Sequence, residues 1–375
     1  MVTNNQDPKC LIVGNYCHDV LIKDDVVIAE SLGGAVSFIS GVLDALSIPS
    51  QYIAKVGPDF AYSVAHKPIA DPSSKTTLFH AHFSSEIKRQ DRVLKRVAAC
   101  DPIFPSDLLS LSSSRFDFGM AVGVGGEILP QTLEKIIDLC SLVFVDIQAL
   151  IRVFDPVDGT VRLIELKDTE FFRLLPKIGV LKASAEEAPY VDVEEARKWC
   201  CVVVTNGKDG CTVYWKDGEL QIAPFQTVQV DPTGAGDSFL GGFVAGLVHG
   251  LAVPDAALLG NFFGSLTVGQ IGLPKFDSKL VQRVKEEVER RRLQSLGFHK
   301  RQDDGLKFVK PLDHEQFHTA LDAAKLISTN AMDESSRGLP GSPRAVVQQS
   351  CHHSNCQQKV LLNSVHEEPI KYAES

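Results

Sequence analysis

The segment from Val230 to Phe239 combines small residues with two acids and then enters a long apolar stretch. It contains Asp-Pro-Thr-Gly-Ala-Gly-Asp and continues as Leu-Gly-Gly-Phe-Val-Ala-Gly-Leu-Val. Because Gly234 and Gly236 carry no side chain, the backbone N–H groups of residues 234–237 can approach a bound anion, and the positive end of the following helix adds to the attraction. The pattern predicts an anion-binding turn at a helix start.

Asp237 falls in the first turn of this expected helix. The helix dipole and the nearby donors favour the ionised form of its carboxyl group. An ionised carboxylate beside a phosphate site can accept the proton of an attacking hydroxyl, so the segment indicates phosphoryl transfer to an alcohol. The alternative is an N-terminal acid that only stabilises a glycine-rich buried helix.

Two other phosphate-binding glycine motifs are excluded. A dinucleotide-binding fingerprint would need glycine where Phe239 stands, and it should follow the first strand rather than lie two thirds along the chain. The chain also has no Gly-x-x-x-x-Gly-Lys-Ser/Thr sequence, which excludes a P-loop enzyme.

Apolar runs separated by helical periods must position this turn. Runs that begin at Cys10, Leu142, Gly179 and Cys201 predict strands buried on both faces. Their alternation with helices predicts an α/β fold with a doubly wound, mostly parallel sheet and helices on both faces. Residues 75–99 alternate polar and apolar side chains around a polar turn, which predicts a half-exposed hairpin.

The sequence after Asp277 is more charged and polar than the preceding core. From Asp277, an expected N-cap, a charged helix with Glu and Arg at i, i+4 spacing is predicted to present a solvated outer face. We expect the core to end near Leu296 and residues 296–375 to form a low-complexity, mostly disordered tail, apart from one helix near 317–327. A zinc site in the tail is a weaker alternative, because a structural site needs four ligands on a framework. Its ligands would be Cys351, His352, His353 and Cys356.

Composition limits the class of protein. The 375 residues are 44% hydrophobic and 23% charged, which is typical of a water-soluble globular protein. A net charge of −9 argues against a nucleic-acid partner. The longest apolar stretch, residues 239–254, is shorter than the roughly 20 residues of a membrane span. The nine cysteines lie mostly in apolar runs and no targeting segment is visible, so we expect a cytoplasmic protein.

The sequence from Asp231 to Asp237 resembles the C-terminal signature Asp-Thr-x-Gly-Ala-Gly-Asp of the pfkB, or ribokinase-like, carbohydrate kinases. Weaker landmarks of the family follow in the expected order over a core at 8–295. The resemblance implies a ribokinase-like fold with a small β lid, whose strands would lie within about 16–32 and 75–100. It also implies an ATP-dependent kinase with a catalytic Asp237, and with an anion hole for the ATP phosphates formed by Gly234, Ala235 and Gly236.

On the substrate side, the resemblance implies a clamp by Asp19, which would hydrogen-bond hydroxyl groups, and a close backbone approach at Gly33 and Gly34. Arg152 follows a segment similar to one in inositol-kinase-like branches of the family and is implied to reach substrate or phosphate. The chain departs from the family at Phe38, where the first signature usually has asparagine. The loss of that amide argues against a standard ribose or fructose pocket.

On the nucleotide side, the resemblance implies ATP contacts by Ser184, Thr205, Gly207 and Asn261. Serine replaces the family's usual asparagine at 184. Glu187 matches the acid near magnesium and is implied to contact Mg²⁺ through water. The cofactor implied is therefore Mg²⁺, with ATP as co-substrate.

The acceptor implied by the branch that this chain resembles most is a cyclic polyol, myo-inositol, phosphorylated at the 3-hydroxyl. A fructokinase or adenosine kinase of the same family is one alternative. A catalytically inactive scaffold is another, favoured by Phe38, Pro58 and Ser184 but opposed by the intact 233–237 segment. We expect partners to be small molecules, with no nucleic acid or membrane, and a monomer or homodimer.

Overall fold

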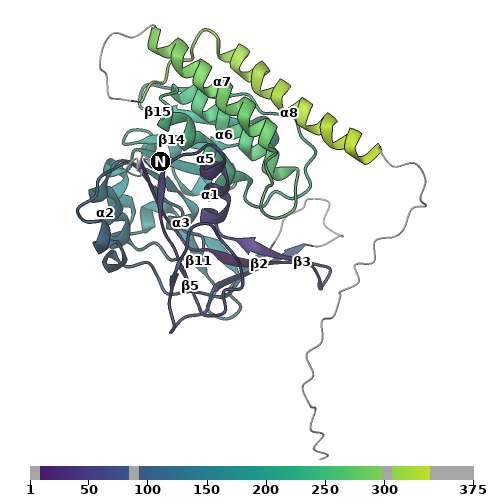
Figure 1. The fold of residues 1–375 in the computed structure, drawn as a ribbon. Helices are drawn as coiled ribbons and strands as arrows, with labels where there is room; N and C mark the ends of the chain where they lie inside the picture. The colour runs from purple at the N-terminus through teal and green to yellow at the C-terminus, as the bar shows by residue number, and fades with distance from the viewer. Residues whose placement is uncertain (1–8, 84–92, 298–305, 338–375) are drawn as a thin grey trace, which may run out of the picture. The chain divides into compact units, whose positions relative to one another are not determined.

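The computed structural model describes residues 9–83, 93–297 and 306–337 (Figure 1). The chain divides into two units, residues 1–331 and 332–375. The zinc alternative at 351–356 lies outside the described residues. The fold described below is that of the first unit.

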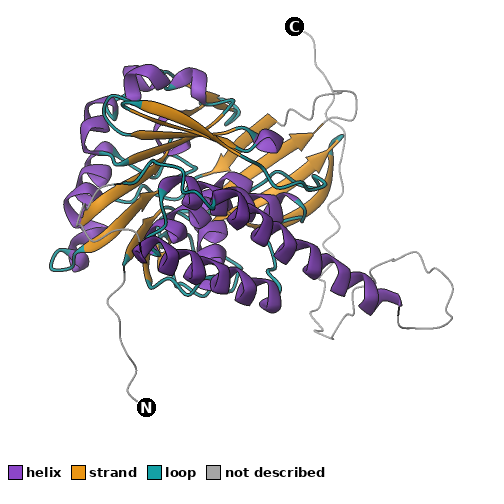
Figure 2. Ribbon diagram, turned by 90° about the horizontal axis from the view of Figure 1, so that it is seen from above, coloured by secondary structure: helices purple, strands orange, loops and turns teal. Residues whose placement is uncertain are grey.

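The first unit is built on an eight-stranded sheet with helices on both sides (Figure 2). Neighbouring strands from β14 to β4 are parallel, whereas β15 and β16 are added antiparallel at one edge. The predicted doubly wound, mostly parallel sheet is confirmed. Its spatial order is β16 (Gly218–Ile222), β15 (Cys211–Trp215), β14 (Cys201–Thr205), β13 (Val180–Ser184), β10 (Cys140–Asp146), β9 (Phe116–Ala121), β1 (Cys10–Val13) and β4 (Ser50–Ile53).

Successive strand residues face two different apolar cores. In β1, Cys10 and Ile12 belong to one core, and Leu11 and Val13 to the other. Burial on both faces explains why the strands are continuous apolar runs. The first core also takes residues from α1 (Ala35–Ala45), α5 (Ala235–Val248), α6 (Val253–Val268) and α7 (Ser278–Gly297), and the second from α2 (Pro130–Leu139), α3 (Gln148–Ile151) and α4 (Val193–Ala196).

A smaller sheet supplies one side of the site described below. Its order is β3 (Val26–Gly33), β2 (Cys17–Lys23), β7 (Thr77–Phe83) and β8 (Val93–Ala98). β7 and β8 pair antiparallel, which confirms the hairpin predicted from residues 75–99, and the tip of that hairpin lies outside the described residues. The parallel pairing of β2 with β7 places Asp19 opposite Phe79.

Short elements complete the described chain. Two further pairs of strands are β5 (Lys55–Val56) with β6 (Ile69–Ala70) and β11 (Arg152–Phe154) with β12 (Val161–Leu163). The 3-10 helices are η1 (Pro105–Leu111), η2 (Leu166–Asp168), η3 (Phe172–Lys177), η4 (Ala188–Tyr190) and η5 (Gly207–Asp209).

The packed region extends beyond the predicted end near Leu296. Asp277 caps α7 as predicted, because its Oδ1 accepts hydrogen bonds from two backbone N–H groups at 3.0 Å. After residues 298–305, the chain enters α8 (His314–Arg337), whose Phe317 and Leu321 are fully buried in the first core. The expected tail boundary is corrected accordingly. The composition of this region predicted a tail because its few buried apolar side chains are surrounded in the sequence by charged and polar residues.

The cysteines behave as the sequence predicted. The seven that the structure describes are buried free thiols, and burial raises the pKa of Cys10, Cys140 and Cys200 to about 12. Within the described ranges, no helix combines the length and apolar character that a membrane crossing requires.

Candidate functional site

The turn before α5 has the backbone geometry that its glycines predicted. Gly234 is the N-cap of α5 and adopts a left-handed conformation with φ of 74°. A Cβ at this position would also lie 2.1 Å from the ring of Phe38, so both the backbone and the packing require glycine. Asp231 stabilises the turn from inside, because its Oδ1 accepts the Thr233 N–H at 2.9 Å.

The N–H groups of the turn are only partly engaged. Ala235 donates to the carbonyl of Pro232 at 3.3 Å. The N-cap carbonyl of Gly234 accepts from the N–H of Ser238 at 2.8 Å, so the N–H groups before Ser238 lie at the open end of the helix. The anion hole expected from Gly234, Ala235 and Gly236 stays a prediction, and Ala235 is the donor whose N–H is already engaged.

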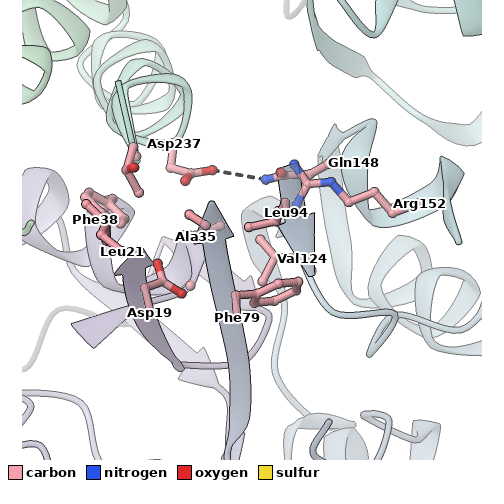
Figure 3. Close-up of a pocket in the computed structure, with 14 residues that line it drawn as sticks. Asp19, Leu21, Ala35, Phe38, Phe79, Leu94, Val124, Gln148, Arg152 and Asp237 are labelled. Atoms are coloured by element: carbon pink, nitrogen blue, oxygen red, sulfur yellow. Dashed lines mark hydrogen bonds between the residues drawn. The ribbon is translucent and has the colours of Figure 1, made fainter. Parts of the chain in front are cut away.

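Asp237 lies in the first turn of α5 and its carboxylate points into a pocket (Figure 3). Its Oδ1 accepts a hydrogen bond from Gln148 Nε2 at 3.2 Å. Burial raises the pKa of Asp237 above its usual value, although the cations of Lys182 and Arg152 act in the opposite direction. The carboxylate is thus held in place and is a stronger proton acceptor than an exposed aspartate.

The same pocket contains the expected substrate clamp. Asp19 comes from β2 and faces the cavity from the side opposite Asp237. A Cβ on Gly33 would lie 2.0 Å from Asp19 Oδ2, so glycine at 33 makes room for this carboxylate. Gly34 has a φ of 84° and precedes α1, and both it and Arg152 line the pocket. The structure therefore brings Asp19, Gly34 and Arg152 into one pocket with Asp237, the predicted catalytic residue, and Gly33 lies against Asp19.

The rest of the pocket is largely apolar. Phe38 of α1 is buried and covers Gly234, at the position where the family pattern suggested asparagine. The pocket thus has an aspartate on each of two opposite sides and an apolar wall between them. That wall is formed by Leu21, Ala35, Phe38, Phe79, Ala81, Leu94 and Val124.

A buried ion pair lies behind the turn. Asp146 ends β10 and is the register partner of Lys182 in β13, and Lys182 Nζ lies 2.9 Å from Asp146 Oδ2. A Cβ on Gly236 would lie 2.8 Å from the same Nζ, which places the ammonium directly behind the turn that is predicted to bind an anion. Burial alone would lower the pKa of Lys182, but the surrounding carboxylates outweigh it and keep the lysine charged. Burial raises the pKa of Asp146 to about 6.

Sequence analysis did not identify Lys182 or Gln148 as site residues. The signal for Lys182 was a single cation within the apolar strand β13, where a charge is costly unless it is paired. Gln148 belongs to the segment that suggested Arg152, but only the fold reveals its hydrogen bond to Asp237.

Ser184 and Glu187 form a compact loop after β13. The Ser184 N–H donates to Glu187 Oε2 at 2.9 Å, and Arg152 Nη2 lies 3.9 Å from Glu187 Oε1. Although burial would raise the pKa of Glu187, Lys182 and Arg152 hold it below its usual value. Glu187 is thus an ionised carboxylate beside the buried ion pair. Within the described residues, no group of three or more His, Cys, Asp or Glu side chains could hold a metal.

The remaining nucleotide-side positions do not line this pocket. Thr205 ends β14 as the register partner of Ser184, and Gly207 follows it with a φ of 58° and open space beside it. The Asn261 amide donates to the carbonyls of Ile222 and Ala223, at 3.3 and 2.9 Å. Asn261 therefore holds the chain segment that follows β16.

The fold and the site together define the class of protein. A parallel sheet between helical layers, a small sheet on one side of the pocket, and a glycine turn that leads into Asp237 are the features expected of a ribokinase-like kinase. The family model "pfkB family carbohydrate kinase" matches residues 165–277. The chain belongs to this family.

Relatives that match over most of their length support this assignment. The chain is 57% identical over 320 residues to inositol 3-kinase of Arabidopsis thaliana, covering 84% of this chain and 87% of the relative. It is 50% identical over 354 residues to inositol 3-kinase of Zea mays, covering 88% and 90%. Among solved structures, it is similar to a pyrophosphate-dependent ribokinase-family kinase complexed with a pyrophosphate analog and myo-inositol. That match has a TM-score of 0.59 and 16% identity and covers 71% of this chain and 97% of the other.

Proposed function

We propose that this protein is an inositol 3-kinase, which transfers the γ-phosphoryl group of ATP to myo-inositol and forms myo-inositol 3-phosphate. The observation that carries the proposal is the meeting of Asp19, Asp237 and Gly234 in one pocket, at the start of α5. The identity of 57% and 50% to two plant inositol 3-kinases, over most of each chain, supports the choice of acceptor. The buried free thiols support a cytoplasmic location.

The site residues have separate roles in the proposed reaction. Asp237 accepts the proton of the attacking hydroxyl, and its bond to Gln148 fixes the carboxylate in the pocket. The N–H groups of the 234–236 turn bind the charge that develops on the transferred phosphoryl group, and the buried ammonium of Lys182 adds positive charge from behind the turn. The small sheet covers the other side of the pocket and limits the access of water, which would compete as acceptor.

The shape of the pocket suits a cyclic polyol. A ring of secondary alcohols has polar hydroxyls at its rim and C–H groups on its two faces. The apolar wall around Phe38 offers a surface to a C–H face, while Asp19 can accept hydrogen bonds from hydroxyls at the rim. A substrate held between the two aspartates presents one hydroxyl to Asp237.

The charges around the turn suit a magnesium nucleotide. Mg²⁺ usually keeps several waters and is held by substrate phosphates with one or two carboxylates. Glu187 is ionised and lies beside the turn, so it is the side chain that we propose to contact the ion through water. When bound, Mg²⁺ neutralises charge on the phosphate oxygens.

A panel of acceptors and donors tests the proposal. The purified protein is incubated with Mg²⁺ and ATP, or with pyrophosphate, and with myo-inositol, fructose or adenosine. We expect ADP release only with ATP and myo-inositol, and a product that is the 3-phosphate by NMR. Turnover with fructose or adenosine would identify another kinase of the family. No turnover with any acceptor would identify an inactive scaffold.

Gly33→Ala should weaken acceptor binding without disturbing the fold. Its Cβ would displace the Asp19 carboxylate, the movable end of a side chain, rather than backbone. We expect kcat/KM for myo-inositol to fall about 10- to 100-fold, the scale of a lost hydrogen bond to a charged group, while KM for ATP is unchanged. Gly41→Ala is the matched control, because nothing lies within 4 Å of a Cβ there. Equal kinetics of the two variants would contradict the role of Asp19.

A further inference from the structure

After α7, residues 306–326 pack against other parts of the first unit. The carbonyl of Lys307 accepts a hydrogen bond from the N–H of Val253, at 2.8 Å, where α6 begins. The ring of Phe308 stacks on Trp215 of β15, with 4.9 Å between the ring centroids. Residues 307 and 308 therefore contact both α6 and β15 of the central sheet before α8 starts.

A buried ion cluster fixes the start of α8. Arg291 of α7 is 1% exposed and donates from Nε to Asp255 Oδ2 at 2.6 Å. The other Asp255 oxygen lies 2.6 Å from His314 Nδ1, and Arg291 also pairs with Asp313. The cluster thus joins α6, α7 and α8, which Figure 1 shows on the same side of the molecule. Sequence analysis expected α7 to present a solvated charged face, but at Arg291 the charge is inside.

Two side chains of α8 reach a segment without regular structure. His318 Nε2 donates to the carbonyl of Pro224 at 3.0 Å, and the His318 ring lies 4.5 Å from that of Phe225. Lys325 Nζ donates to the carbonyl of Gln226 at 2.8 Å and to Ser265 Oγ at 3.1 Å. On the same helix, Phe317 and Leu321 are fully buried and hold it in place.

His318 and Lys325 contact the segment of residues 223–230, which connects β16 with the predicted anion-binding turn. Its start is held by Asn261, which contacts the carbonyl of Ala223, and its end by Val230, whose N–H donates to Val268 at 2.8 Å. Within the described residues, the hydrogen bonds to the carbonyls of 224 and 226 come from α8 alone. Residues 226–230 are all exposed, so few packing contacts fix them.

We infer that His318 and Lys325 are positioning residues for nucleotide binding. By holding the carbonyls of Pro224 and Gln226, they fix the path of residues 223–230 and thereby the turn that follows at 231–236. The inference rests on the proposed function for the assignment of that turn to the nucleotide. If α8 releases the segment, its conformational freedom increases, and ordering it again costs free energy whenever the nucleotide binds.

The test compares nucleotide affinity with acceptor kinetics in the full-length chain. The variants are His318→Ala, Lys325→Met and their combination. We expect the dissociation constant of ADP, measured by calorimetry, to rise about three- to tenfold in each single variant, the scale of one lost hydrogen bond. KM for ATP should rise in parallel, with little change in KM for myo-inositol. ADP binding is measured without an acceptor, so it reports on the inference even if myo-inositol is not the substrate.

Matched variants separate positioning from general stability. His318→Gln keeps a donor near the position of Nε2, and Lys325→Arg keeps a cation, so both should retain nucleotide affinity. Lys310→Met removes an exposed lysine just before α8, which pairs with Glu315 on the surface, and should change nothing. The inference is overturned if the double variant binds ADP as tightly as the wild type. It is also overturned if both KM values rise together as the melting temperature falls.

Discussion

Asp237→Asn is expected to lower kcat by about 10²- to 10⁴-fold, the contribution typical of a positioned general base. Asparagine has nearly the same shape, so the bond to Gln148 and the packing of the first turn of α5 can be retained. The variant loses only the capacity to take a proton from the acceptor hydroxyl. ADP affinity should stay close to that of the wild type, because the carboxylate serves the acceptor. Steady-state kinetics and calorimetry measure the two quantities.

Asp231→Asn is the control for this prediction. It makes the same substitution in the same turn, at a carboxylate that accepts the Thr233 N–H and so stabilises the turn. Its effect on kcat should remain below about tenfold, since the amide oxygen can accept the same bond. If the two variants lose activity equally, Asp237 serves the turn and is not the base.

The pH profile gives an independent readout for Asp237. Burial raises the pKa of this carboxyl group, so its ionised form is lost at a higher pH than in an exposed aspartate. Wild-type kcat/KM should therefore fall as the pH decreases through that raised pKa. The direction follows because the protonated group cannot accept the hydroxyl proton. Activity that is unchanged into the acid range would exclude a buried base.

The sequence predicted the parts of the site that depend on backbone conformation. Gly234 and Gly236 before an apolar helix are a local signal, and the structure has the turn and the N-terminus of α5 there. The strands beginning at Cys10 and Cys201 were recognisable because burial on both faces leaves only apolar residues. Asp19 was found only through its resemblance to a family element, since an aspartate after a strand is otherwise a common turn residue.

Contacts between distant parts of the chain could not be predicted in this way. The pair of Asp146 with Lys182 depends on the register of β10 against β13, which no single segment encodes. The docking of α8 depends on Arg291, a residue that resembles its exposed neighbours in α7 and is buried only because Asp255 lies opposite. Buried charges are recognisable as such only when both partners are known.

The second large effect is expected at Lys182. Lys182→Met removes the ammonium that lies behind the 234–236 turn, and we expect kcat to fall about 10²- to 10³-fold, as when one donor to a developing negative charge is lost. The same change leaves Asp146 buried without its cation. Loss of one partner of a buried pair costs about 3–5 kcal/mol in the free energy of unfolding, so low activity alone would not distinguish catalysis from folding.

A double variant resolves these two effects. In Lys182→Met with Asp146→Asn, the buried charge is absent, and the asparagine oxygen can still accept the Gln148 N–H that Asp146 Oδ1 now holds at 3.4 Å. Replacement of both members of a buried pair is often nearly neutral, so denaturant unfolding should show most of the lost stability restored. Catalysis should remain impaired, because neither neutral side chain offers a positive charge to the phosphoryl group. A double variant that regained both stability and wild-type kcat would show that Lys182 acts only as the partner of Asp146.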